Sequence, residues 1–170
     1  MFENIREDWQ TYQYDFTRQG LWVMLVYRFG RWRYTIKTRW IRLPFSFLYK
    51  ALYLFIQIMT GIELPCEAKV GKRFTIEHFS GIIVSGDAVF GDDVIIRNGV
   101  TVGLRHTSIR GSPIIGNRVD IGAGAKLLGP IQIGDDVAIG ANAVVIKDVP
   151  SNSIAVGVPA KIIPRKATTD

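Results

Sequence analysis

Residues 115–126 read Ile115-Gly116-Asn117-Arg118-Val119-Asp120-Ile121-Gly122-Ala123-Gly124-Ala125-Lys126, two consecutive units of six residues that share one pattern. Each unit begins with an aliphatic residue, continues with glycine and carries a small or branched residue at its fifth position. A period of six fits neither an amphipathic helix nor an alternating strand. It is the signature of a β-helix built from hexapeptide repeats.

The pattern extends from these units toward both ends of the chain. Each repeat is predicted to form a short strand and a turn, three repeats make a triangular coil, and roughly a dozen repeats support about five coils. We therefore predict a mainly β fold with a β-helix domain over residues 62–163, whose coils bury their core only by stacking. The aliphatic first positions, expected to fill the prism, are Leu64, Val70, Ile76, Val84, Phe90, Ile96, Val102, Ile115, Ile121, Leu127, Ile133, Ile139 and Val145.

Two irregularities interrupt the repeat. Val84 follows Ile76 by eight positions instead of six, so the repeat slips by two residues just after His78. Ile115 follows Val102 by thirteen positions. The second interruption is polar and basic and contains glycine, so residues 103–114 are predicted to form an extended loop outside the prism. Loops on rigid scaffolds often carry function, which makes this loop a candidate part of a site.

The first 61 residues have a different composition. Sixteen of the nineteen aromatic residues lie before residue 60, together with nine Lys/Arg against four Asp/Glu. Their apolar pattern predicts an α-helical N-terminal region. The longest apolar run, residues 43–59, contains Lys50 at its centre and is not expected to span a membrane. Two roles stay open: helices that pack on themselves and on neighbouring subunits, or a basic face in peripheral contact with a membrane.

Charge, cysteine content and the N-terminal sequence bear on the kind of ligand, on metal binding and on the cellular location. The net charge of +6 and the pI of about 9.6 suit an acidic membrane surface or a phosphate-bearing ligand, and no nucleic-acid recognition motif accompanies them. The single cysteine, Cys66, and two histidines give no metal-ligand spacing, so no metal is expected. No secretory signal pattern is visible, which predicts a cytoplasmic protein, in the membrane case peripheral to its inner face. Residues 164–170 are expected to form a C-terminal tail.

Several longer phrases resemble one family of enzymes. They are Tyr27-Arg28-Phe29-Gly30-Arg31-Trp32, Phe74-Thr75-Ile76-Glu77-His78, Gly99-Val100-Thr101-Val102-Gly103, Ile121-Gly122-Ala123-Gly124-Ala125-Lys126-Leu127-Leu128-Gly129 and Gly157-Val158-Pro159-Ala160-Lys161. At these residues the chain resembles the serine acetyltransferase branch of the hexapeptide acyltransferases, most closely the smaller branch found in exopolysaccharide and colanic-acid clusters. The resemblance implies a left-handed β-helix, homotrimers with active sites between subunits, and acetyl transfer from acetyl-CoA to a hydroxyl group.

The family's catalytic pair falls on His78 and Glu63. In the family a histidine is the general base and a carboxylate one coil earlier orients it, and the fifteen residues between these two are close to one coil. The chemistry requires such a pair, because the attacking hydroxyl must lose its proton and a carboxylate stabilises the resulting imidazolium. His106, in the extended loop, is the rival base and a candidate acceptor contact.

The acceptor contacts differ from the family's pattern. Glu77 replaces the family's aspartate beside the histidine, Asp15 matches an acceptor-binding aspartate of the helical region, and Arg105 or Arg110 is a candidate contact from the loop. Where serine acetyltransferases carry Arg-His-Pro for the serine carboxylate, this chain reads Gly-Ser-Pro at 111–113. We therefore expect a sugar hydroxyl in polysaccharide biosynthesis as the acceptor, with L-serine as the alternative and a non-catalytic trimeric scaffold as a second alternative.

The donor, acetyl-CoA, is expected in a groove between the loop and adjacent coils. The family resemblance places backbone amides near Gly103 and Gly122 at the thioester oxygen, where acyl transfer needs hydrogen-bond donors. Candidate residues for binding CoA are Gly103, Gly122, Ala123, Lys126, Lys161 and Arg165.

Overall fold

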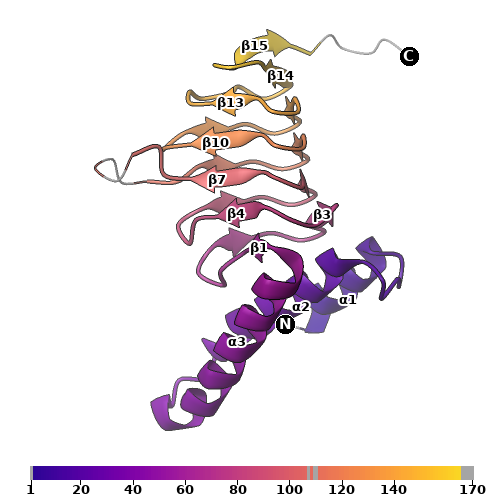
Figure 1. Ribbon diagram of the computed structural model, residues 1–170, viewed down its shortest axis with the longest axis vertical. Coiled ribbons are helices and arrows are strands. Elements are labelled where there is room, and N and C mark those ends of the chain that lie inside the picture. Colours follow the sequence, from indigo (N-terminus) through magenta and orange to yellow (C-terminus); the bar gives the residue numbers. More distant parts are fainter. Residues whose placement is uncertain (1, 107, 109–110, 166–170) are drawn as a thin grey trace.

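The computed structural model describes residues 2–106, 108 and 111–165, in which three helices precede a stack of short strands (Figure 1). The helices are α1 (Phe2–Thr11), α2 (Gln19–Arg33) and α3 (Arg39–Thr60). The strands are β1 (Ile62–Glu63), β2 (Lys69–Val70), β3 (Thr75–Glu77), β4 (Ile82–Val84), β5 (Val89–Phe90), β6 (Ile95–Arg97), β7 (Thr101–Gly103), β8 (Ile114–Ile115), β9 (Asp120–Ile121), β10 (Lys126–Leu128), β11 (Gln132–Ile133), β12 (Ala138–Ile139), β13 (Val144–Val145), β14 (Ser153–Val156) and β15 (Lys161–Pro164).

The strands form the three walls of a parallel β-helix of about five coils. One wall runs β1-β4-β7-β10-β13, the second β2-β5-β8-β11 and the third β3-β6-β9-β12-β14-β15. Every pairing is parallel except the last, in which β15 lies antiparallel on β14. The predicted β-helix with an N-terminal helical region is confirmed, while its left hand stays a prediction from the resemblance.

The register explains both irregularities of the repeat. Ile62 pairs with Ile82, twenty residues later, so the slip after His78 lengthens the first coil by two residues beyond eighteen. Ile95 pairs with Asp120, twenty-five residues later, because the loop adds seven residues to that coil. Asp120 pairs with Ala138 eighteen residues later, and Ala138 pairs with Ile154 sixteen residues later, so the last coil is two residues shorter. Both insertions leave the walls in register, since each lies between strands.

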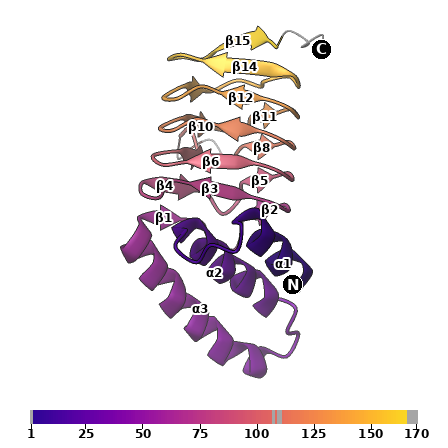
Figure 2. The ribbon, with the colours of Figure 1, turned by 90° about the vertical axis from the view of Figure 1, so that its right-hand side faces the viewer.

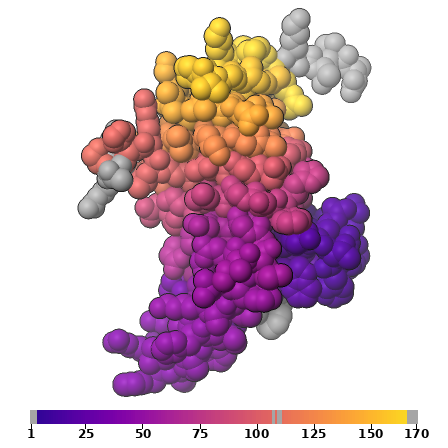
Figure 3. All heavy atoms as spheres, in the orientation of Figure 1, coloured from indigo at the N-terminus to yellow at the C-terminus, as the bar shows by residue number. Residues whose placement is uncertain are grey.

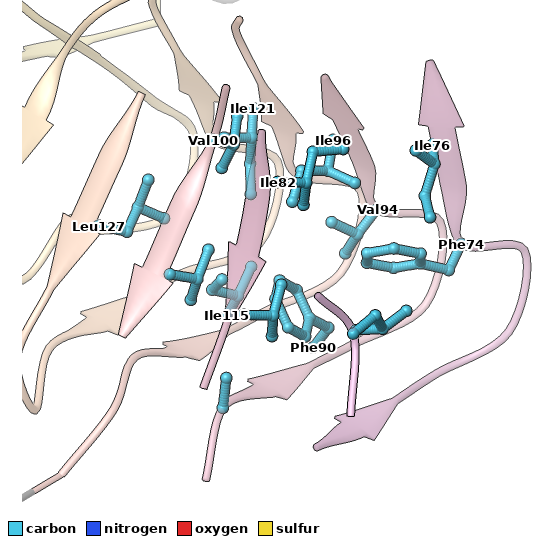
Figure 4. Packing of buried hydrophobic residues seen from close by; sticks show 14 of the residues in the cluster. Phe74, Ile76, Ile82, Phe90, Val94, Ile96, Val100, Ile115, Ile121 and Leu127 are labelled. Carbon is cyan, nitrogen blue, oxygen red and sulfur yellow. The ribbon is translucent and has the colours of Figure 1, made fainter. Parts of the chain in front are cut away.

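The interior of the prism is a single column of apolar side chains (Figure 4). All predicted first positions are buried except Val70, which is partly buried in the first coil where α2 covers the prism. The fifth positions are fully or almost fully buried and have room only for small or branched side chains: Ala68, Ala88, Val94, Val100, Val119, Ala125, Val137 and Ala143. Each coil therefore contributes a layer that only its neighbours can cover.

Helices α1 and α2 close the N-terminal end of the prism (Figure 2). Arg28 of α2 is buried and forms two hydrogen bonds to Asp8 of α1, at 2.8 and 3.1 Å. The same guanidinium donates to the carbonyl oxygens of Val70 and Gly71 in the first coil. The Tyr27 hydroxyl donates to the Ala68 carbonyl at 2.8 Å. One polar cluster thus joins both helices to the β-helix.

Helix α3 packs along α2 and leads directly into β1. It ends at Gly61, whose φ of 65° lies in the left-handed region that glycine adopts without strain. Among the described residues, α3 alone is long and apolar enough to cross a membrane, and only 17% of its most apolar 18-residue window is buried.

Candidate active site

His78 lies in an open groove between the start of α2 and the end of β3. The groove has a volume of about 500 Å³ and is lined by Arg18, Gln19, Gly20, Ile76, Glu77, His78 and Phe79. His78 is exposed and has a φ of 59°, because it begins the turn that contains the two extra residues of the first coil. Histidine tolerates this left-handed conformation better than most residues, and the turn directs its backbone out of the strand.

The start of α2 lies in close contact with the backbone of β3, and this contact positions α2 at the groove. The Tyr12 hydroxyl accepts a hydrogen bond from the Ile76 amide at 2.8 Å, which fixes the chain ahead of α2 to β3. Gly20 lies so near that a Cβ atom would be 2.7 Å from both the Ile76 carbonyl oxygen and the Tyr12 hydroxyl oxygen. Only glycine fits here, so the approach of α2 to His78 depends on this residue.

We expect Gly20→Ala to destabilise the fold by about 1–3 kcal/mol, the usual range for an overpacked site. The same change should lower activity, because α2 must move away from His78. Urea unfolding followed by circular dichroism measures the first effect. Gly103→Ala is the matched control for stability, since its Cβ would meet only Ser85 Cβ at an ordinary 3.6 Å. Equal unfolding midpoints for the two variants would contradict the tight fit at Gly20.

Glu77, the predicted acceptor contact beside His78, already forms an ion pair. Arg97, its partner in the next coil, lies 2.9 Å from its carboxylate and also binds Asp120 one coil further on. These carboxylates raise the pKa of Arg97, the hydrogen bond to Asp120 most strongly. Glu77 also lines the groove, so the same carboxylate that pairs with Arg97 lies at the groove surface beside His78.

Asp15 lies just ahead of α2 and does not line the groove itself. Its carboxylate accepts hydrogen bonds from the Thr17 hydroxyl at 2.7 Å and the Thr17 amide at 2.9 Å, which lower its pKa. It also lies 3.4 Å from Arg18, which does line the groove. Asp15 is therefore connected to the groove only through its ion pair with Arg18.

Glu63 and His78 lie near the same corner of the prism, at the start of the first wall. The turn after His78 rests on the start of β1, because the Gly81 amide donates to the Gly61 carbonyl at 2.9 Å. The register places Ile83 directly beside Glu63, and the stacking of Glu63 on His78 stays a prediction. No hydrogen bond joins the two side chains within the described part of the chain. Burial, with a smaller contribution from the Glu63 charge, raises the pKa of nearby Tyr53 to about 12.

The extended loop leaves the prism at a different corner. It follows β7 and returns at β8, whereas His78 precedes β4, so the whole width of the first wall separates the two corners (Figure 1). The Arg105 side chain packs near Gly129, two coils above the level of β4, and His106 is exposed. Arg110 lies outside the described residues. One chain alone therefore does not bring Arg105 or His106 to His78.

Some of the residues predicted to bind CoA already form hydrogen bonds within the protein, and others have exposed side chains. The Gly122 amide donates to the Ile139 carbonyl at 2.8 Å, so it is not available to a thioester oxygen. Lys126 donates to the Gly99 carbonyl and the Thr101 hydroxyl on the outer face of the first wall. The side chains of Lys161, on β15, and Arg165, just after it, are exposed. Gly103 ends β7 beside the loop, and Ala123 lies in the corner turn after β9.

Comparison with known proteins assigns the family. The family model described as bacterial transferase hexapeptide (six repeats) matches residues 112–147. A serine acetyltransferase of Helicobacter pylori strain J99 is 46% identical over 126 residues, which cover 70% of each chain. The chain belongs to the hexapeptide-repeat acyltransferases, in their serine acetyltransferase-like branch.

Solved structures of serine acetyltransferases agree with this assignment. The enzyme of Neisseria gonorrhoeae in complex with serine superposes with a TM-score of 0.78 at 28% identity, covering 95% of this chain and 68% of that one. A serine acetyltransferase in complex with CoA gives a TM-score of 0.74 at 32% identity, covering 86% of this chain and 57% of that one. This serine acetyltransferase-like chain thus spans between half and about two thirds of these longer proteins.

The comparisons confirm acetyl transfer as the reaction class and correct the acceptor. The expected sugar hydroxyl in polysaccharide biosynthesis is wrong, because the named relatives and the superposed structures are serine acetyltransferases. That prediction rested on the missing Arg-His at 111–112, on the short N-terminal region and on its basic aromatic face, and it did not consider Arg18, which lines the groove. Arg18 lies only three residues after the predicted Asp15, and Arg97 lies one coil after Glu77. Both ion pairs could therefore have been predicted from the spacing of these residues in the sequence. Among the described residues, no group of three His, Cys, Asp or Glu could hold a metal.

Proposed function

We propose that the protein transfers the acetyl group of acetyl-CoA to the hydroxyl group of L-serine. The observation that carries this proposal is the composition of the groove: one imidazole at His78, one guanidinium at Arg18 and one carboxylate at Glu77. Serine presents a hydroxyl, a carboxylate and an ammonium group, so each has a partner of matching chemistry. The serine-bound and CoA-bound structures of related enzymes support both substrates.

In this mechanism His78 acts as the general base. Its imidazole takes the proton of the serine hydroxyl as the oxygen attacks the thioester carbonyl. The tetrahedral intermediate then collapses, the carbon–sulfur bond breaks, and the imidazolium returns the proton to the leaving thiolate. The products are O-acetylserine and CoA, and no acyl-enzyme forms. Glu63, at the same corner, stabilises the imidazolium through its negative charge.

The test is turnover with acetyl-CoA and L-serine. Release of free thiol should depend on both substrates, and mass spectrometry should detect O-acetylserine. D-serine and L-alanine are matched controls, because the first reverses the positions of the carboxylate and ammonium groups and the second lacks the hydroxyl. A chain that is folded and binds CoA but releases no thiol with L-serine would contradict the proposal.

Arg18→Gln should raise the KM for serine by roughly tenfold or more, since hydrogen bonds to charged groups contribute about 1.5–3 kcal/mol. The KM for acetyl-CoA should stay constant, because Arg18 faces the acceptor groove. Arg118→Gln is the matched control: Arg118 is another exposed arginine paired with an aspartate, Asp136, but it lies far from the groove. A parallel rise in both KM values would show that Arg18 does not select the acceptor.

Glu63→Gln should lower kcat by at least about tenfold, because a neutral amide no longer stabilises the imidazolium. It should also move the acid limb of the pH–rate profile to lower pH, which a purely structural role would not do. Glu67→Gln removes another carboxylate of the first coil, one that accepts a hydrogen bond from Tyr34 instead of lying at the His78 corner. Stopped-flow thiol release over pH separates the two variants, and identical profiles would remove Glu63 from the mechanism.

A homotrimer completes the proposed site. The loop at 103–114 and His78 lie at different corners of one prism, so a closed threefold ring would place the loop of one copy beside the His78 corner of the next. Light scattering should give a trimer. Mixed refolding of His78→Asn with a variant lacking residues 105–110 should restore part of the activity that neither has alone. A stable active monomer would contradict this arrangement.

A further inference from the structure

Helix α3 presents an uncovered apolar face along its whole length. Trp40 is 82% exposed, Phe47 71% and Ile58 73%, although all three are large apolar side chains. Figure 3 shows α3 extending past the end of the β-helix with nothing packed in front of it. The exposed apolar residues of this face, called the outer face of α3 below, are Trp40, Ile41, Pro44, Phe47, Leu48, Ala51, Leu54, Phe55, Ile58 and Met59.

The helical period divides α3 into three sides. Positions 40, 44, 47, 51, 55 and 58 recur at the spacing of one helical face, so the outer face is a continuous apolar stripe. Tyr49, Ile56 and Thr60 are buried on the opposite side, against the rest of the protein. Between these two sides runs a polar strip that contains Arg39, Ser46, Lys50 and Gln57. An exposed apolar stripe of this size marks an interaction surface.

The charges of α3 indicate the kind of partner. The helix contains no Asp or Glu, and Lys37 and Arg39 at its start and Lys50 in its middle are exposed cations. Residues 1–60 as a whole carry five of the six net positive charges of the chain. Apolar side chains on one face, Trp at one end and lysine or arginine along the side are the composition of helices that lie in the interface of an anionic bilayer.

We propose that α3 lies flat on an anionic lipid surface, with its outer face buried in the headgroup region. The opposite side of α3 packs on the protein and its last residue leads into β1, so only one face is free to enter lipid. A spanning orientation would place Lys50 near the middle of the bilayer, where a charge is costly. A second copy is a poorer partner, because its α3 would present the same cations and no acid. This proposal does not rest on the acceptor or on the catalytic residues.

The test is flotation of the full-length protein with lipid vesicles. We expect binding to vesicles that contain phosphatidylglycerol to be about tenfold tighter than to pure phosphatidylcholine, and to weaken as salt rises. The double variant Phe47→Glu/Ile58→Glu should lose about tenfold or more in affinity for the anionic vesicles, since both charges would enter lipid. Phe47→Leu/Ile58→Leu keeps the face apolar and should bind like the parent.

Further variants separate the cationic contribution and the competing outcome. Lys50→Gln should reduce binding to anionic vesicles severalfold, whereas Lys147→Gln, an exposed lysine of the β-helix far from α3, should not. Far-ultraviolet circular dichroism establishes that each variant is folded. Equal binding by the Glu and Leu double variants would overturn the proposal. So would a smaller oligomer for the Glu variant in the absence of lipid, because the outer face would then be a subunit interface.

Discussion

Replacing His78 by asparagine should lower kcat by roughly 10²–10⁴-fold, the usual contribution of a general base. Asparagine is the informative choice because the backbone at position 78 has a φ of 59°, a conformation that asparagine accepts and alanine does not. The loss should therefore appear in kcat while the melting temperature and the KM for acetyl-CoA stay near those of the parent. Single-turnover thiol release measures the chemical step directly.

His78→Ala and His106→Asn complete this experiment. The alanine variant should be as inactive as the asparagine variant and less stable, since it adds backbone strain to the loss of the base. If His106→Asn instead lost the chemical step and His78→Asn kept it, the base would be the loop histidine. In that case the groove between α2 and β3 would not be the acceptor site.

Replacing Asp8 by asparagine should destabilise the protein by about 3–5 kcal/mol, because it leaves the buried Arg28 guanidinium without a counter-charge. Asp8 is 0% and Arg28 5% exposed, so water cannot take over the lost contact. The guanidinium also holds the carbonyl oxygens of Val70 and Gly71, so both helices should loosen from the first coil. Urea unfolding at one fixed protein concentration measures the change.

The paired control is Asp136→Asn, which removes the same kind of aspartate–arginine contact from an exposed site. Surface pairs contribute little, so its unfolding midpoint should stay close to that of the parent. The double variant Asp8→Asn/Arg28→Met tests the mechanism, because removing both charges should recover part of the stability. No recovery would mean that the hydrogen bonds of Arg28 to the first coil, and not the uncompensated charge, dominate.

Most of the β-helix could be predicted from the sequence because one physical requirement repeats every six residues. Leu64, Ile96 and Ile121 had to be buried, and they are, since no other arrangement covers an aliphatic residue at that period. Val70 departs from the pattern because its layer meets α2 instead of a full preceding coil. There the Tyr27 hydroxyl donates to the Ala68 carbonyl and accepts from the Val70 amide, contacts between residues 41 and 43 positions apart that no local pattern encodes.

The candidate site was harder to predict, because its groove forms between distant segments. The sequence indicated His78 and Glu77 through a family phrase, but Arg18 joins them only because Gly20 allows α2 to approach β3. Glu63 was assigned from the family resemblance, and its distance of fifteen residues from His78 was compared with a coil of eighteen, whereas the two-residue slip makes the first coil twenty residues long. Lys126 and Gly122 appeared free in the sequence, whereas the structure engages both in hydrogen bonds.

The two ends of the β-helix differ in a way that affects solubility. A stack of parallel coils has an open strand edge at each end, to which another copy could add its own strands and continue the stack into a fibre. Here α1 and α2 cover the strand edge at the N-terminal end of the β-helix (Figure 2). At the C-terminal end, the antiparallel β15 covers the edge of the third wall. The reversal matters, because a strand that runs against the others offers the next coil the wrong pairing pattern. The same closing segment that carries Lys161 thus also covers the last strand edge of the third wall.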